Sequence, residues 1–173
     1  MLRSALRFLA VSLFGAVVIA AAAGAGAASL PEPTDKPILT VTGKIGVTNK
    51  DGTAQFDRAM LEALGRASFS TSTPWYKEPV MFEGVPLAKL MDAVGATGDR
   101  IVSVGLNDYS AEMPMEDARK LGVILALKRD GIYMTVRDKG PIFIIYPFDS
   151  NPDLKMQKYY SRSVWQVARI EVK

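Results

Sequence analysis

Apolar and polar positions along this 173-residue chain follow strand-like or helix-like spacing in short segments. Residues 38–48 (ILTVTGKIGVT) alternate nearly throughout, which predicts a strand, and residues 49–52 (NKDG) predict a turn after it. Apolar side chains recur at helical spacing in residues 58–64, with Asp57 as a candidate N-cap and Gly65 at the end. The first part of the domain is therefore predicted to form a strand, a turn and a short helix.

A second helix is predicted after Pro86, over residues 87–94, and it should end at Gly95. Its expected buried side consists of Leu87, Leu90, Met91 and Val94. A further short helical turn is expected at 115–122. Before the second helix, the hydroxyl-rich stretch 69–87 (FSTSTPWYKEPVMFEGVPL) is either a surface loop or the wall of a pocket.

The second half of the chain is predicted to be mostly β. Strands are expected at 100–107, 123–128, 132–136, 140–148 and 163–172. Residues 129–131 (RDG) indicate a hairpin turn, because glycine tolerates positive φ there. Residues 149–162 form a long polar connection in this interpretation. No internal repeat is present, so the pattern predicts one α+β domain, with mixed β-sheets and short helices packed on them.

The N-terminus has the pattern of a secretory signal peptide. An arginine-containing start is followed by a long apolar run and by small residues at 25–28 (AGAA), which predicts cleavage after Ala27 or Ala28. A retained membrane anchor is the alternative. The expected organisation is a signal peptide at 1–28, a Pro-rich linker at 29–37 and one domain at 38–173, located in the periplasm.

Composition excludes several classes of function. Without Arg3 and Arg7 of the signal peptide, the formal net charge falls from +3 to +1, which gives no reason to expect nucleic acid as a partner. The chain contains no cysteine and no histidine. It therefore has no thiolate nucleophile, no Cys/His zinc site and no Ser-His-Asp triad.

Four segments concentrate polar and aromatic residues at predicted strand ends or in loops: 70–76, 107–114, 136–141 and 158–166. The candidate ligand-binding residues in them are Thr71, Ser72, Thr73, Trp75, Asn107, Asp108, Tyr109, Arg137, Lys139, Tyr160, Ser161, Arg162, Ser163 and Trp165. Each has a plainer interpretation: solvated hydroxyls, a packed tryptophan, an Asx turn or surface charges. No catalytic residue and no metal ligand is predicted.

Taken in order, four motifs resemble a known family. FEGVPLAKLMDAVGA, NDYSAEMPMED, RDKGPIFIIYPFD and YSRSVWQVARIEV are similar to the oxidoreductase molybdopterin-binding domain, the sulfite oxidase catalytic fold. The resemblance covers residues 35–173. It implies a compact mixed fold in which loops hold the pterin.

The chain departs from the catalytic members of that family at two places. Those members have a cysteine that binds molybdenum upstream of the GVPL motif, where this chain has Ser70 to Thr73. A hydroxyl is a poor replacement for a soft thiolate on a redox metal. Phe143 also stands where the family pattern has an arginine. The resemblance therefore implies a pocket that has lost its metal ligand, and no molybdenum is expected.

The sequence is most similar to a smaller class with this fold, the metal-free periplasmic pterin-binding proteins. The resemblance implies a protein that senses a dihydro- or tetrahydropterin. Its implied partner is the periplasmic domain of an inner-membrane cyclic-di-GMP signalling protein. A pterin needs a ring to stack on, for which the candidates are Trp75, Tyr109, Tyr160 and Trp165. Asp108 could accept hydrogen bonds from the edge of the pterin, and Arg162 with neighbouring hydroxyls could meet its carbonyl.

Three hypotheses follow. The first is the non-catalytic pterin sensor. The second is a subunit of a molybdopterin-dependent oxidoreductase that lacks the usual cysteine, with Lys139, Lys158 and Arg162 on the cofactor's phosphate. The third is a structural interaction module whose pocket no longer binds a ligand.

Overall fold

The structure is a computed structural model that describes residues 29–173. The predicted signal peptide, residues 1–28, lies outside the described residues. Residues 29–37, predicted to be a linker, contact the domain: the backbone amides of Thr34 and Asp35 donate to Asp57 Oδ2 at 2.9 and 3.1 Å. Within residues 29–173, no helix has the length and hydrophobicity needed to cross a membrane.

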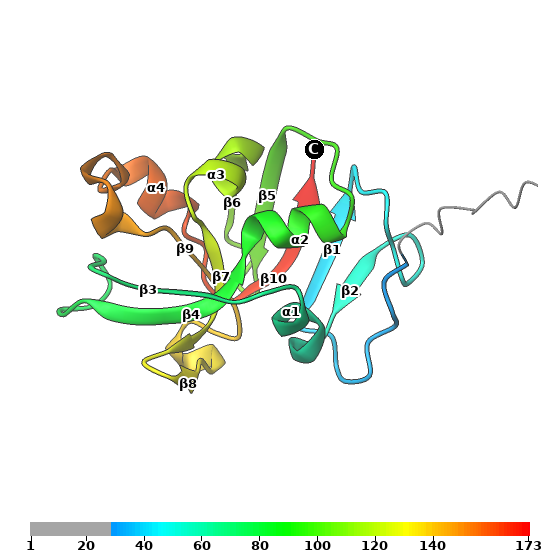
Figure 1. Ribbon diagram of the computed structural model, residues 1–173, viewed down its shortest axis with the longest axis horizontal. Coiled ribbons are helices and arrows are strands. Elements are labelled where there is room, and N and C mark those ends of the chain that lie inside the picture. The colour runs from blue at the N-terminus through cyan, green and yellow to red at the C-terminus, as the bar shows by residue number, and fades with distance from the viewer. Residues whose placement is uncertain (1–28) are drawn as a thin grey trace, which may run out of the picture.

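Two five-stranded sheets form the framework (Figure 1). The first has the order β2 (Ala54–Phe56), β1 (Leu39–Gly43), β10 (Val167–Val172), β5 (Arg100–Gly105) and β6 (Ser110–Pro114). In it, β1 and β10 are parallel, and the other pairs are antiparallel. The second has the order β3 (Ala67–Thr71), β4 (Val80–Pro86), β7 (Ile124–Arg129) and β8 (Ile132–Tyr133), and β9 (Phe143–Ile145) also pairs with β7.

The helices of the described residues are short. They are α1 (Arg58–Ala63), α2 (Leu87–Ala93), α3 (Met115–Lys120) and α4 (Gln157–Arg162), with 3-10 turns η1 (Val136–Asp138), η2 (Phe148–Ser150) and η3 (Pro152–Leu154). Helix α1 begins as predicted, because the Asp57 side chain accepts the amide of Met60 at 2.9 Å. Helix α2 follows Pro86 and ends before Gly95, whose φ is +58°.

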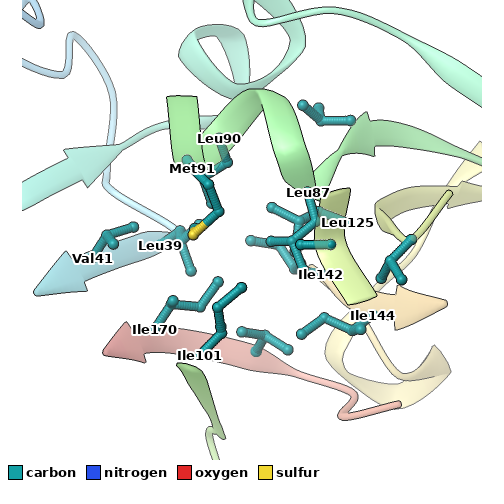
Figure 2. Packing of buried hydrophobic residues seen from close by; sticks show 14 of the residues in the cluster. Leu39, Val41, Leu87, Leu90, Met91, Ile101, Leu125, Ile142, Ile144 and Ile170 are labelled. Atoms are coloured by element: carbon teal, nitrogen blue, oxygen red, sulfur yellow. The ribbon is translucent and has the colours of Figure 1, made fainter. Parts of the chain in front are cut away.

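One hydrophobic core joins the two sheets. The side of α2 predicted to be buried is fully buried: Leu87, Leu90, Met91 and Val94 are 0% exposed. In Figure 2, Leu90 and Met91 point toward β1, while Leu87 lies beside Leu125 of β7 and Ile142. Because α2 packs on residues from both sheets, its burial fixes the sheets relative to each other.

Several segments differ from the predicted elements. The stretch 69–87, expected to be a loop or pocket wall, contains most of β3 and all of β4, which pair from Ala67↔Gly84 to Thr71↔Val80. Residues 110–114 form strand β6 on β5, and the polar connection 149–162 contains α4. Strands β3 and β6 are edge strands and α4 has an exposed side, so few of their side chains are buried and their apolar period is hidden in the sequence.

Candidate functional site

The two tryptophans of the chain lie together in one aromatic cluster. The ring centroid of Trp75 is 6.0 Å from that of Trp165, 6.1 Å from that of Tyr160 and 5.2 Å from that of Phe143. Both tryptophans are half-buried, so one side of the cluster reaches the surface. We name Trp75, Phe143, Phe148, Tyr160 and Trp165 the aromatic cluster.

Phe143 of β9 is the buried centre of this cluster. It is 0% exposed, and its ring meets those of Trp75, Trp165 and Phe82 edge to face, with interplanar angles of 62°, 84° and 89°. The resemblance seen in the sequence implied an arginine at this position. A guanidinium there would have to be buried among aromatic rings, whereas phenylalanine extends the hydrophobic core to the tryptophans.

The hydroxyls that replace the expected cysteine hold the turn that carries Trp75. Thr71 is buried, and its Oγ1 accepts the amide of Asp149 at 3.0 Å, while Thr73 Oγ1 accepts the amide of Trp75 at 3.3 Å. The Asp149 carboxylate accepts the amide of Ser72 at 2.6 Å and pairs with Lys155 at 2.6 Å. These two contacts, that of Lys155 first, lower the pKa of Asp149. The turn is thereby tied to η2.

A nearly buried carboxylate supports α4. The Asp117 carboxylate accepts the Tyr146 hydroxyl at 2.7 Å and Arg162 Nη1 at 2.8 Å. The Arg162 side chain remains 24% exposed, and its guanidinium lies 5.6 Å from the ring centroid of Tyr159. Burial, and then the bond to Asp117, raises the pKa of Tyr146, so its hydroxyl stays a donor. Asp117 therefore fixes one side of Arg162 and leaves the guanidinium partly accessible.

Lys139 adds a second cation. It sits in the left-handed region, with φ of +71°, and its ammonium lies 4.9 Å from the ring centroid of Trp165. Its carbonyl accepts the amide of Gln166, whose side-chain amide donates to the Val136 carbonyl at 2.7 Å. These contacts attach the 136–139 turn to the segment that carries Trp165.

The 107–109 loop approaches α4 from β5. Asn107 Oδ1 accepts the amide of Tyr109 at 3.2 Å, which is an Asx turn, and Asp108 pairs with Arg169 at 3.1 Å. The Tyr109 hydroxyl donates to the Ser161 carbonyl at 3.0 Å. The loop is therefore joined to α4, but its ionised carboxylate is directed to β10.

The predicted site residues divide into three sets. Trp75, Lys139, Tyr160 and Trp165 come together directly, and Arg162 lies on the same short helix as Tyr160. A second set is bonded to the protein itself: Thr71, Ser72 and Thr73 in the turn, Asn107, Asp108 and Tyr109 in their loop, and Ser161 and Ser163 to carbonyls of α4. Arg137 is exposed in η1, and no contact among the described residues joins it to the aromatic cluster.

Sequence reasoning missed several residues that build the site. Phe148, Asp117, Tyr146 and Asp149 have no place in the predicted set, yet they pack against or orient its members. Phe148 and Tyr146 lie in a continuous apolar run that indicated only a core strand. Asp117 could have been found only by knowing that it pairs with a cation far away in the chain. A single sequence does not show which acid pairs with which cation.

Neither of two cavities on the protein is lined by a predicted site residue. One of about 270 Å³ is lined by residues of α1, β3, β4 and β7, and another of about 230 Å³ lies beside β8. Neither lining includes a member of the aromatic cluster. Among residues 29–173, no group of three or more carboxylate, histidine or cysteine side chains is placed to hold a metal ion. Chemically, the aromatic cluster offers rings with the Lys139 ammonium over one of them.

Comparisons with known proteins support the fold. No protein-family model matches the sequence, and the search of curated proteins gives no match. Among solved structures, the sulfane dehydrogenase SoxCD from Paracoccus pantotrophus is similar, with a TM-score of 0.59 and 17% sequence identity. The match covers 78% of this chain and 37% of that one, so this chain spans well under two thirds of its neighbour. The fold class predicted from the sequence is confirmed: the chain has an α+β fold of the sulfite-oxidase-like type, with two mixed sheets and short helices.

Proposed function

We propose that this protein is a non-catalytic periplasmic pterin-binding protein that senses a reduced pterin and regulates a membrane-bound cyclic-di-GMP cyclase or phosphodiesterase. The observation that carries the proposal is the convergence of Trp75 with Tyr160 and Trp165, which lie about 85 to 90 residues further along the chain, with Lys139 over one ring. The regulatory partner rests on the sequence resemblance alone.

The aromatic cluster fits a flat heterocycle. The rings of Trp75 and Phe143 meet Trp165 at 77° and 84°, so neither of them stacks parallel on it. The Lys139 ammonium over that ring is a flexible group that can move aside and donate to a ligand carbonyl. A pterin stacked on Trp165 would gain dispersion from the ring and a charge-assisted hydrogen bond from Lys139.

The residues also fit a ligand without a metal better than a metal cofactor. The hydroxyls of Thr71 and Thr73 would have to replace a thiolate as metal ligands. Both already accept hydrogen bonds from backbone amides. The donor edge of a pterin must find acceptors, and backbone carbonyls are the candidates because Asp108, Asp117 and Asp149 already have ionic partners.

The first test is binding. Protein purified from cells that express the full chain is titrated anaerobically with tetrahydrobiopterin and followed by isothermal titration calorimetry. We expect saturable binding, and Trp165→Ala should weaken it about tenfold or more because the stacking surface is lost. Tyr133→Ala, which removes a ring outside the aromatic cluster, is the control and should leave the affinity unchanged. Native protein that shows no binding, or equal losses in both variants, would contradict the proposal.

A second candidate function is a molybdopterin-dependent oxidoreductase subunit, which the shared fold with a sulfane dehydrogenase favours. Elemental analysis of the purified protein separates the two. We expect less than stoichiometric molybdenum and, after acid denaturation, release of a blue-fluorescing pterin. Stoichiometric molybdenum would support the oxidoreductase instead. Absence of both, together with a tight protein complex, would support the interaction module.

A further inference from the structure

The larger cavity lies between α1 and the second sheet, away from the tryptophans. Its volume is about 270 Å³, and its walls come from the end of α1, the start of β3, the end of β4 and the end of β7. Its lining includes Glu62, Arg66, Glu83, Val85, Leu127 and Lys128. None of the residues that line it belongs to the aromatic cluster.

A bulge in the sheet creates the hollow. The pairing of β4 with β7 shifts between Glu83 and Gly84, which leaves Leu127 as an extra residue opposite them. A side chain at Gly84 would collide with the backbone of Leu125 and Ala126, so glycine keeps this part of the sheet closely packed. Val85 and Leu127, 0% and 2% exposed, lie behind the polar side chains and form the closed floor of the cavity.

A row of polar side chains crosses the same face of the sheet. Ser68 is paired with Glu83, Glu83 with Lys128, and Lys128 with Tyr133, so all four side chains project to one side. The Tyr133 hydroxyl donates to Glu62 at 2.7 Å, and the Lys128 ammonium lies 4.7 Å from the Tyr133 ring centroid. Strands and helix thus bring both signs of charge to the cavity.

The charges in this cavity are not neutralised by each other. Glu83 and Lys128 occupy cross-strand partner positions, yet neither forms an ion pair within the part of the chain that the structure describes. Both side chains are half-buried. Arg66 supplies a second cation and Glu62 a second carboxylate to the lining. A ligand that carried one charge of each sign would satisfy both kinds of group at once, whereas a singly charged ligand would face a like charge as well.

We propose that this cavity is a second binding site, for a small zwitterion of amino-acid size. The ligand's ammonium group would pair with Glu83 and its carboxylate with Lys128. This site is separate from the proposed pterin site, and its occupation does not depend on a pterin.

Three compounds that differ in a single group test the proposal on the native chain. L-leucine carries both charges, 3-methylbutylamine lacks the carboxylate, and 4-methylpentanoate lacks the ammonium. Each is titrated into 15N-labelled protein while the backbone amide signals are followed by NMR. We expect saturable shifts with L-leucine at Ser68, Gly84 and Lys128, and affinities about tenfold or more weaker for both analogues, because each loses one charge-assisted contact.

Two variants and one control locate the charges. Glu83→Gln and Lys128→Met should each weaken L-leucine binding about tenfold or more. Lys89→Met, which makes the same charge change as Lys128→Met but on the exposed side of α2, should leave the affinity unchanged. The proposal is overturned if L-leucine gives no saturable shifts, if its shifts map to the tryptophans, or if either analogue binds as well as L-leucine. These ligand comparisons decide the matter even if a variant fails to fold.

Discussion

At the scale of single residues, Asp117 helps to build the candidate site, although it was not among the predicted site residues. Its carboxylate is shared by the fully buried Tyr146 hydroxyl and by Arg162 on α4. An ion pair so little exposed is held by geometry and hydrogen bonding, and loss of one partner leaves the others unsatisfied. Asp117 is therefore a positioning residue for Arg162.

We predict that Asp117→Ala lowers the free energy of unfolding by about 2–3 kcal/mol, because a buried hydroxyl and a half-buried guanidinium lose their acceptor. Urea denaturation at neutral pH measures this. The matched control is Asp92→Ala, which breaks an ion pair of similar length, 2.9 Å to Arg119, between exposed side chains. That change should cost less than about 1 kcal/mol. Equal costs for the two variants would show that the position of Asp117 does not matter.

The same scale shows what a single sequence can reveal about a site. The tryptophans were found because their residue type and loop setting indicate binding, and they do lie together. The hydroxyls at 71–73 were predicted to face the ligand, but Thr71 and Thr73 are engaged by backbone amides of Asp149 and Trp75. Side-chain hydroxyls bond to nearby backbone as readily as to a ligand, and the sequence does not distinguish the two.

At the scale of elements, Asp57 links α1 to the segment that precedes the domain. One of its oxygens caps the helix at Met60, and the other accepts the amides of Thr34 and Asp35. These bonds, that of Met60 first, lower the pKa of Asp57. The predicted N-cap is thus confirmed, and it also holds residues predicted to be a linker.

We predict that Asp57→Ala costs about 2 kcal/mol at pH 7, through loss of the cap and of the bonds to residues 34 and 35. Because the pKa of Asp57 is lower in the folded protein than in the unfolded chain, its ionised form stabilises the fold above about pH 3.9. That contribution is lost as the pH falls through the folded pKa. Asp57→Asn keeps a capping oxygen but no charge, so its unfolding free energy should fall less between pH 5 and pH 2. Identical pH profiles for Asn and Asp would contradict this.

Helices were easier to predict than edge strands, for a physical reason. Helix α2 has a proline start, a glycine end and four buried apolar positions, and each of these marks the same boundaries. Strand β3 has an alternation of exposed Ser68 and Ser70 with only one large apolar side chain, Phe69, and pairs with β4 alone among the described strands. Its conformation is set by pairing with β4. For the pairs of Ala67, Ser68 and Phe69, the partner residue in β4 lies 13 or more positions further along the chain, so the local sequence carried little of the signal.

At the scale of the whole molecule, the aromatic cluster links parts of the fold that are distant in sequence. Trp75 follows β3, Phe143 belongs to β9, Tyr160 to α4, and Trp165 precedes β10 of the other sheet. In Figure 1, α4 lies above the left end of the second sheet, on the same side as the β3–β4 turn. A ligand bound here would contact segments that unfolding separates, so its binding must stabilise the entire domain.

This linkage gives a prediction for the intact protein. A ligand that binds only the folded state at a free concentration about 100-fold above its Kd adds about 2.7 kcal/mol to the unfolding free energy. For a domain of this size, that corresponds to a rise in Tm of about 5–10 °C. We therefore expect differential scanning calorimetry with saturating tetrahydrobiopterin to show such a rise, and Trp165→Ala to reduce it at the same pterin concentration.

Because Trp165→Ala also removes packing against Trp75 and Phe143, its Tm without ligand will be lower, and the relevant quantity is the shift in Tm on adding pterin. A shift of equal size in both proteins would place the pterin elsewhere, because a ligand that stacks on Trp165 cannot stabilise the fold equally after the ring is removed.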